Sequence, residues 1–349
     1  MAAQLPNTFE DITLDWFRST VASSVTSIHV EPLDPSKGLI GDLARVHAQH
    51  DTSTGPASYI VKLPAANPGS REIGMMLNAY GREVLFYQQL APRLARLQLP
   101  TCYYAAADAP SQRWVVVLQD CPADEFDFLA GATQLQAEAA VDALAEFHAS
   151  GWQRPPIEWM PGFDAGGVCG LQPLWLKNLP AFLERYNDVI PGETGQWVTR
   201  FAPHLADWST HAATEPLTIV HADYRLDNLL FNDGSVTMID WQTAMRAPAA
   251  MDLSCFISTS LTVPNRRNVE DHLIARYLAR LNGAGITVGH EWFRRSYNEN
   301  LLWWMGQFAN NLAHLAPGDD RVQTALTAMV ERVYTAAADR DVGRLLTGE

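Results

Sequence analysis

A change in residue pattern near position 120 limits the fold of this 349-residue chain more than any other feature. Before that point, apolar and β-branched residues alternate with polar ones, which is typical of half-buried strands. One longer run between the strands has the spacing of an amphipathic helix. The predicted elements are a short helix at 8–19, strands at 25–33, 39–49, 58–63, 101–107 and 113–119, and a long helix at 70–90.

Beyond position 120 the pattern is mostly helical, and one mixed stretch, 217–240, contains three short strand-like runs. The predicted helices are 133–150, 173–187, 193–210, 269–282, 290–314 and 320–338. The polar segment 120–131 contains proline and glycine and is interpreted as a connector. The sequence therefore predicts an α+β, bilobal fold, with a β-rich N-lobe at 1–119 and a larger helical C-lobe at 132–349.

The net negative charge of the chain limits the kinds of molecule that it is expected to bind. It carries 39 acidic and 25 basic residues, a net charge of −14, which argues against binding to nucleic acid or to an anionic membrane. No run approaches the roughly 18 apolar residues of a membrane span, and the first residues do not resemble a secretory signal. The four cysteines form no Cys-x-x-Cys pair, so we interpret them as free thiols of a cytoplasmic protein.

Polar residues gather at one place in the mixed stretch. His221 and Asp223 follow a short apolar strand, Asn228 lies five residues after Asp223, and Asp240 ends the second strand of a tight hairpin. Phosphoryl transfer needs such a set: one carboxylate accepts the proton of the attacking hydroxyl, and the amide and second carboxylate hold Mg²⁺. Ordinary turn chemistry explains Asp233 in the hairpin but not the whole pattern.

This segment resembles the catalytic loop and metal-binding strand of the aminoglycoside phosphotransferase and choline kinase superfamily, which shares the protein-kinase fold. The resemblance is closest to the ecdysteroid-kinase-like branch and related bacterial phosphotransferases. It implies ATP and Mg²⁺ as cofactors, Asp223 as the catalytic base, Asn228 and Asp240 as magnesium ligands, and His221 as support for the loop. Two departures stand out: Ala222 replaces the commoner glycine, and Trp241-Gln242 replaces Phe-Gly after Asp240.

The nucleotide site is expected in the N-lobe. Lys62 is one of only three lysines among the 25 basic residues and lies in an apolar strand, where a kinase places its phosphate-binding lysine. The alternative is a strand lysine whose charged end reaches solvent. Its expected partner is Glu83, which precedes Phe-Tyr as in the family, although Glu72 shares the same helix face.

Further candidates follow from position. Gly38 and Gly41 lie at a strand turn and could bind phosphate through main-chain N–H groups, or form an ordinary hairpin turn. Gln119 and Cys121 would offer main-chain groups to the purine. Asp252 matches a family residue that braces the catalytic loop, or it caps a helix.

The acceptor is expected in the C-lobe. Residues 250–340 hold nine acidic residues and nine arginines, so this region is neutral. An aromatic run from Trp292 to Phe308 belongs to the core or lines the acceptor pocket, and the adjacent Trp303 and Trp304 cannot both face one way. A neutral or apolar alcohol suits such a region better than a polycation, and a quaternary amine would also suit it.

We therefore expect an ATP- and Mg²⁺-dependent O-kinase whose partner is a small hydroxylated molecule. An aminoglycoside or choline-type kinase is the alternative within this class. A silent nucleotide-binding pseudokinase is the alternative outside it, and the intact set of Lys62, Asp223, Asn228 and Asp240 argues against that reading. A protein kinase is less favoured because no Ala-Pro-Glu segment follows Asp240.

Overall fold

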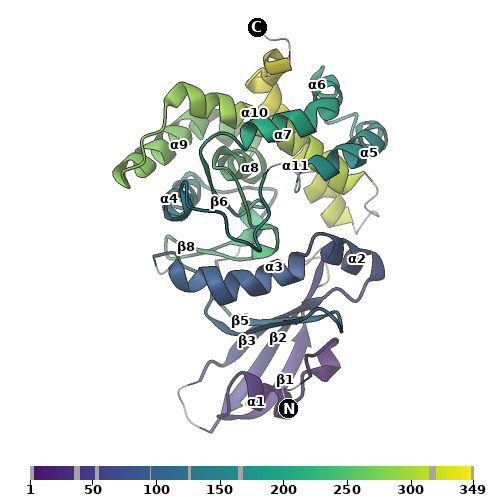
Figure 1. Ribbon diagram of the computed structural model, residues 1–349, viewed down its shortest axis with the longest axis vertical. Helices are drawn as coiled ribbons and strands as arrows, with labels where there is room; N and C mark the ends of the chain where they lie inside the picture. Colours follow the sequence, from purple (N-terminus) through teal and green to yellow (C-terminus); the bar gives the residue numbers. More distant parts are fainter. Residues whose placement is uncertain are drawn as a thin grey trace. The chain divides into compact units, whose positions relative to one another are not determined.

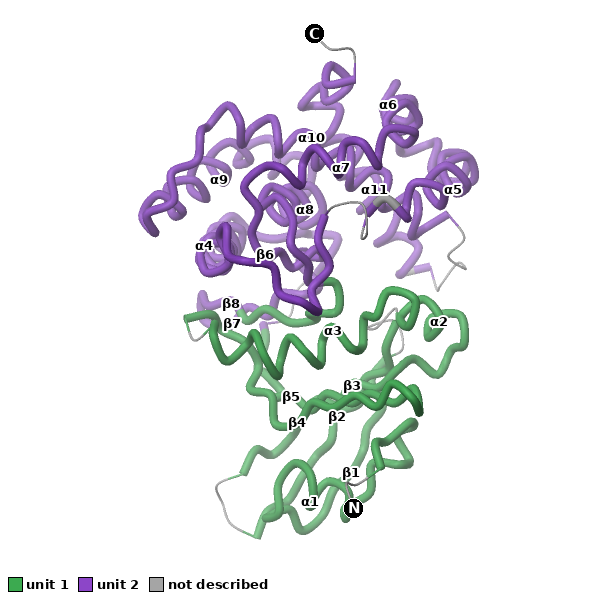
Figure 2. Tube along the Cα trace, viewed as in Figure 1, with its two compact units in different colours: residues 1–123, 237–243 green, residues 124–236, 244–349 purple. Residues whose placement is uncertain are grey.

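The computed structural model describes residues 4–34, 40–51, 55–94, 96–124, 127–163, 168–313 and 320–346 (Figure 1). The chain forms two compact units, and each unit is built from two separate stretches of the sequence (Figure 2). Unit 1 consists of Met1–Ala123 and Thr237–Thr243, and unit 2 of Asp124–Val236 and Ala244–Glu349. The predicted α+β class is confirmed, with an antiparallel sheet in unit 1 and mainly helices in unit 2. The functional division into nucleotide and acceptor lobes stays a prediction.

Unit 1 contains a five-stranded antiparallel sheet in the order β1-β2-β3-β5-β4. Its strands are β1 (Val25–Pro32), β2 (Gly41–His50), β3 (Ser58–Pro64), β4 (Cys102–Asp108) and β5 (Arg113–Gln119). On one face, Tyr59, Val61 and Leu63 are buried in an apolar core with residues of helix α1 (Leu14–Thr20). Because side chains alternate along a strand, Lys62 lies on the opposite face.

The predicted helix at 70–90 is wrong in detail, because the structure breaks it. Helix α2 (Pro68–Met76) ends before Asn78, α3 (Ala79–Leu85) follows, and a π-helical turn, η3 (Phe86–Leu90), completes the segment. Asn78 has φ +49°, a left-handed conformation that asparagine tolerates better than most residues. Likewise, the helix predicted at 8–19 consists of a 3-10 turn at Phe9–Asp11 followed by α1.

Unit 2 is built from helices around two short strand pairs. The helices are α4 (Gln134–Gly151), α5 (Gln172–Arg185), α6 (Thr194–Phe201), α7 (Leu205–Ala212), α8 (Ala250–Ser260), α9 (Val263–Gly283), α10 (His290–Leu312) and α11 (Asp320–Asp339). Strand β6 (Leu217–Val220) pairs with β9 (Met245–Pro248). Strand β7 (Leu229–Asn232) forms a hairpin with β8 (Ser235–Met238). The boundary between unit 2 and unit 1 falls inside β8, after Val236.

The elements predicted for unit 2 do not include α8 or β9, although the capping alternative for Asp252 implied a helix near α8. All eleven residues of α8 are buried, so the helix has no polar face and shows no amphipathic period. The helix predicted at 193–210 is divided by a 3-10 turn at Ala202–His204, which contains a proline. Among the described residues, no helix combines the length and apolar character needed to cross a membrane.

The aromatic run of α10 belongs largely to the core of unit 2. Trp303 and Trp304 are each only 4% exposed, which favours the core over a pocket lining for these two residues. The Trp303 ring packs among the rings of Phe163, Trp175 and Trp208. Trp304 points elsewhere, and its Nε1 donates to the carbonyl of Met251 at 2.8 Å.

A glycine of α10 makes this packing possible and yields a first prediction. A Cβ at Gly306 would overlap the ring of Trp175, which is fully buried and cannot move aside. Gly306→Ala should therefore destabilise the protein by about 1–3 kcal/mol, the usual cost of overpacking. Thermal unfolding measures the effect. The control Gly283→Ala, with nothing within 4 Å of the added atom, should leave stability unchanged or slightly raised. Equal effects of both substitutions would contradict the packing argument.

Candidate active site

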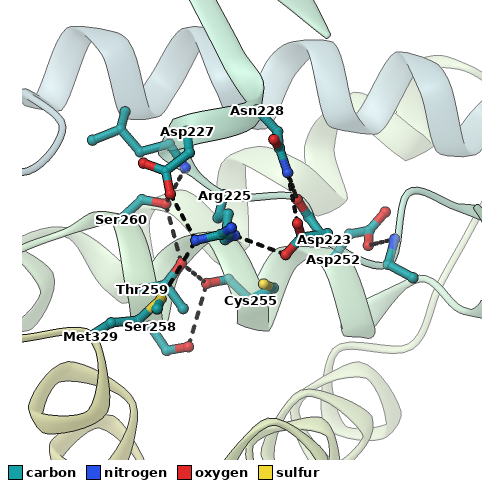
Figure 3. Close-up of polar contacts among 12 residues, drawn as sticks. Asp223, Arg225, Asp227, Asn228, Asp252, Cys255, Ser258, Thr259, Ser260 and Met329 are labelled. Carbon is teal, nitrogen blue, oxygen red and sulfur yellow. Dashed lines mark hydrogen bonds and ion pairs between the residues drawn. The ribbon is translucent and has the colours of Figure 1, made fainter. Parts of the chain in front are cut away.

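The loop between β6 and β7 in unit 2 brings Asp223 and Asn228 together. The Asn228 side-chain amide donates from Nδ2 to the Asp223 carboxylate oxygen Oδ2 and to the Asp223 main-chain carbonyl, both at 2.8 Å (Figure 3). Asn228 is buried, whereas the Asp223 side chain is 31% exposed. The five-residue spacing seen in the sequence therefore closes into a direct contact that orients the carboxylate.

Asp252, in the first turn of α8, holds the start of this loop. Its carboxylate is fully buried and accepts hydrogen bonds from the main-chain N–H groups of His221 at 2.6 Å and Ala222 at 2.8 Å. His148 Nε2 lies 3.1 Å from the same carboxylate, and His148 Nδ1 lies 2.6 Å from the Tyr277 hydroxyl. The N-cap of α8 is instead Ala249, so Asp252 bonds to the loop rather than to its own helix.

The conformation that Asp252 holds is a strained one. Ala222 has φ +60°, in the left-handed region that suits glycine and costs an L-residue about 1–2 kcal/mol. Such strain persists only where surrounding contacts determine the backbone. The two hydrogen bonds to Asp252 provide those contacts, so the alanine stands where a glycine would fit without strain.

Unit 1 contains a second group of predicted site residues. Lys62 Nζ lies 2.7 Å from Glu83 Oε1 and 3.1 Å from Asp240 Oδ1. Burial alone would lower the pKa of Lys62, but the charges of Asp240 and Glu83 outweigh it and raise the pKa above its ordinary value. Glu72, the other candidate partner, is exposed to solvent. Lys62 is therefore held as a cation between two carboxylates.

Trp241 and Gln242, which depart from the family pattern, pack beside this group. The Trp241 ring is fully buried and stacks on the ring of Phe86 in the π-helical turn, with centroids 3.9 Å apart and planes 7° apart. The buried Gln242 side chain hydrogen-bonds to the Glu83 carboxylate. Sequence reasoning assigned neither contact a role. The Trp241–Phe86 stacking fixes the residue next to Asp240, and the Gln242 hydrogen bond orients the Glu83 carboxylate.

The remaining nucleotide candidates are less tightly placed. Gly41 begins β2, and Gly38 lies outside the described residues. Gln119 ends β5, and Cys121 follows two residues later, both partly exposed. Between them, Asp120 accepts hydrogen bonds from Arg45 Nε at 2.6 Å and Ser58 Oγ at 2.7 Å, a contact that the sequence did not predict.

The comparisons with known proteins identify the family and the fold. The model of the phosphotransferase enzyme family matches residues 41–295, and the chain belongs to that family. Its fold is similar to choline kinase from Cryptosporidium parvum Iowa II, at 12% identity and a TM-score of 0.57 over 95% of this chain and 97% of that one. It is also similar to macrolide 2′-phosphotransferase from Brachybacterium faecium, at 16% identity and a TM-score of 0.51 over 90% and 97% of the two chains.

A third structure of similar fold is spectinomycin phosphotransferase in complex with ADP and spectinomycin, at 15% identity and a TM-score of 0.52 over 98% of this chain and all of that one. A search of curated proteins finds no match. The expected membership and the kinase-like fold are confirmed, while the ecdysteroid-kinase-like branch stays a prediction.

The oxygen atoms of Asn228 and Asp240 are of the type that would suit magnesium shared with phosphates rather than a closed protein site. Among the residues that the structure describes, no cluster of three or more His, Cys, Asp or Glu side chains could hold a metal. The hydrogen bonds that the Asn228 side chain makes to Asp223 both use its amide nitrogen, so Oδ1 is the hard oxygen that could bind a metal. Mg²⁺ commonly takes one or two protein oxygens and completes its shell with waters and substrate phosphates.

The strain at Ala222 gives a second prediction. Ala222→Gly relieves about 1–2 kcal/mol of left-handed strain and loses about 0.4–1 kcal/mol through a more flexible unfolded chain. We expect a small net rise in thermal stability, measured by calorimetry. The same substitution at Ala139, inside α4, should lower stability by about 1 kcal/mol. A loss of stability in Ala222→Gly would show that the residue is not strained.

Proposed function

We propose that this protein is an ATP- and Mg²⁺-dependent phosphotransferase that phosphorylates a hydroxyl of a small molecule. The observation that carries the proposal is the Asp223–Asn228 contact within a loop anchored on buried Asp252. That contact presents a partly exposed carboxylate in a fixed orientation, as proton acceptance from a bound hydroxyl requires. Family membership supports the reaction class.

Each residue of the proposed site has a separate task. Asp223 accepts the proton of the acceptor hydroxyl, and His221 and Asp252 hold its loop. Lys62 binds nucleotide phosphate and Glu83 holds Lys62. Asn228 and Asp240 would hold Mg²⁺, which neutralises charge on the phosphates when bound. The proposed main-chain contacts to nucleotide come from Gly38 and Gly41 for phosphate and from Gln119 and Cys121 for adenine.

A catalytically silent pseudokinase is the competing class. A pseudokinase usually lacks one of the charged groups of the reaction, whereas this chain has Lys62, Asp223, Asn228 and Asp240. Lys62 is also paired with Glu83 at 2.7 Å, an ion pair that active kinases need. These observations favour an active enzyme.

The acceptor that we propose is a neutral or apolar alcohol, and its support is now the charge balance of residues 250–340, because the aromatic run is largely core. A cationic acceptor, such as an aminoglycoside or a choline-type amine, is the second candidate. One observation favours it: unit 2 as a whole has 27 acidic and 16 basic residues, a net charge of −11. Acidic residues of 124–236, outside the neutral region, supply that excess.

The third prediction concerns the base. Asp223→Asn should lower kcat about 10²–10⁴-fold, the usual contribution of general base catalysis, with the affinity for ATP and Mg²⁺ nearly unchanged. Turnover is measured by ADP release and affinity by calorimetry. The same substitution at Asp233, an exposed turn residue with φ +48°, should leave both values unchanged. Normal turnover in Asp223→Asn would rule out the assigned base.

The fourth prediction separates the acceptor classes. A panel of sterols, aliphatic alcohols, choline and aminoglycosides is tested for transfer, and KM of each substrate is followed from low to physiological salt. KM of a neutral alcohol should hardly change, because burial of apolar area contributes roughly 25 cal/mol per Å² at any moderate salt concentration. KM of a polycation should rise as salt shortens the Debye length to about 8 Å. Efficient, salt-sensitive turnover of an aminoglycoside alone would establish the second candidate.

A further inference from the structure

The side chain of Arg225 lies at the centre of the catalytic loop, between two carboxylates (Figure 3). Its Nε donates to Asp223 Oδ1 at 2.9 Å, and its Nη1 donates to Asp227 Oδ2 at 2.7 Å. The Arg225 side chain is 17% exposed, less than either carboxylate. Both ends of its guanidinium are thus held by residues two positions away in the same loop.

Arg225 and Asn228 together contact both oxygens of the Asp223 carboxylate. One carboxylate oxygen, Oδ2, accepts from Asn228, and the other, Oδ1, accepts from Arg225. Together these contacts restrict rotation of the carboxylate about its side-chain bonds. A carboxylate has about four lone-pair sites, so both oxygens can still accept a further hydrogen bond. The contacts with Arg225 and Asn228 therefore orient the Asp223 carboxylate and still allow it to accept a proton.

Main-chain contacts fix the loop independently of Arg225. Asp252 binds the N–H groups of His221 and Ala222, and Ser260 Oγ accepts from the N–H of Leu226 at 3.0 Å. Met329 of α11 lies beside the guanidinium, with its sulfur 3.8 Å from Arg225 Nη1. The backbone path on both sides of Arg225 is thus set by α8, and replacement of the arginine side chain leaves these anchors in place.

We infer that Arg225 is a positioning residue for the proposed reaction: its guanidinium holds the Asp223 carboxylate toward the acceptor hydroxyl, and Asp227 holds the guanidinium. The planar fork of arginine bridges two carboxylates in a way that the single ammonium of lysine does not reproduce. This inference rests on the proposed function, because it assigns Arg225 to the base of that reaction. It gives Asp227 an indirect role, through Arg225 alone.

The test compares Arg225→Met and Arg225→Lys with the wild-type protein, in ATP hydrolysis by water and in transfer to each acceptor of the panel. We expect Arg225→Met to lower kcat about 10–100-fold, as expected for a misplaced catalytic group, and Arg225→Lys to recover part of the loss. KM and calorimetric affinity for MgATP should stay within about twofold of wild type, because positioning of the base does not involve nucleotide binding. The control Arg267→Met removes an exposed arginine that is also paired with a carboxylate, Asp339, and should change neither value.

A double-variant cycle tests the indirect role of Asp227. Asp227→Asn should reduce kcat a few-fold in the wild-type background and have no further effect in Arg225→Met, because Asp227 acts only through the guanidinium. Added guanidinium ion at millimolar concentration should raise the turnover of Arg225→Ala, and methylammonium at equal ionic strength should not. Rescue of turnover by guanidinium without a change in melting temperature would support positioning over a purely structural role.

Different results would contradict the positioning role of Arg225 and the proposed phosphotransferase activity. Weaker MgATP binding in Arg225→Met with kcat near that of wild type would mean that Arg225 binds phosphate instead, and would overturn the inference. Wild-type kcat in Arg225→Met, beside strong loss in Asp223→Asn, would also overturn it and leave the proposed function standing. If the wild-type protein neither hydrolyses ATP nor transfers phosphate to any acceptor, the proposed function fails and the inference fails with it.

Discussion

The buried carboxylate of Asp252 is the constraint on which the loop between β6 and β7 of unit 2 depends. A charge in an apolar core is costly unless hydrogen-bond donors surround it. Here the donors are two consecutive main-chain N–H groups of the loop and the imidazole of His148. These N–H groups reach one carboxylate with Ala222 in the left-handed conformation. The cost of an unsatisfied buried carboxylate exceeds the strain at Ala222, so the loop keeps this shape.

A comparable balance of charges organises unit 1. Lys62 is almost buried and would lose its proton more readily there without the carboxylates of Glu83 and Asp240. Glu83 is buried as well and depends on Lys62 and Gln242 for partners. The stacking of Trp241 on Phe86 packs the residue after Asp240 against the π-helical turn. Removal of the Lys62 charge would leave buried Glu83 without its ion-pair partner, which is strongly destabilising, whereas loss of Asp240 would leave the Lys62–Glu83 pair in place.

The sequence predicted the strands of unit 1 because they are rich in β-branched and apolar residues and are bounded by turn residues. Only β3 shows a clear alternation of buried and partly buried residues, whereas β5 has five buried residues in a row. Sequence reasoning failed at α8 because a helix that is buried all round has no period to detect. It also joined α2 and α3, because one asparagine in a left-handed conformation breaks the helix without any glycine or proline at that position. At α8, burial on all sides rather than a local pattern accompanies the helix.

The sequence by itself determined the residue types of the candidate site and their close spacing, because His221, Asp223 and Asn228 lie on one short loop after a strand. The resemblance favoured Glu83 over Glu72, which shares the face of the predicted helix, and the structure places Glu83 against Lys62 from 21 residues away. The sequence could not assign Arg225, whose fork closes on Asp223 and Asp227 within a loop that α8 holds. Nor could it place Trp303 and Trp304, which are both buried because different neighbours surround α10 on two sides. Such choices depend on contacts between residues far apart in the chain, which the tertiary structure alone creates.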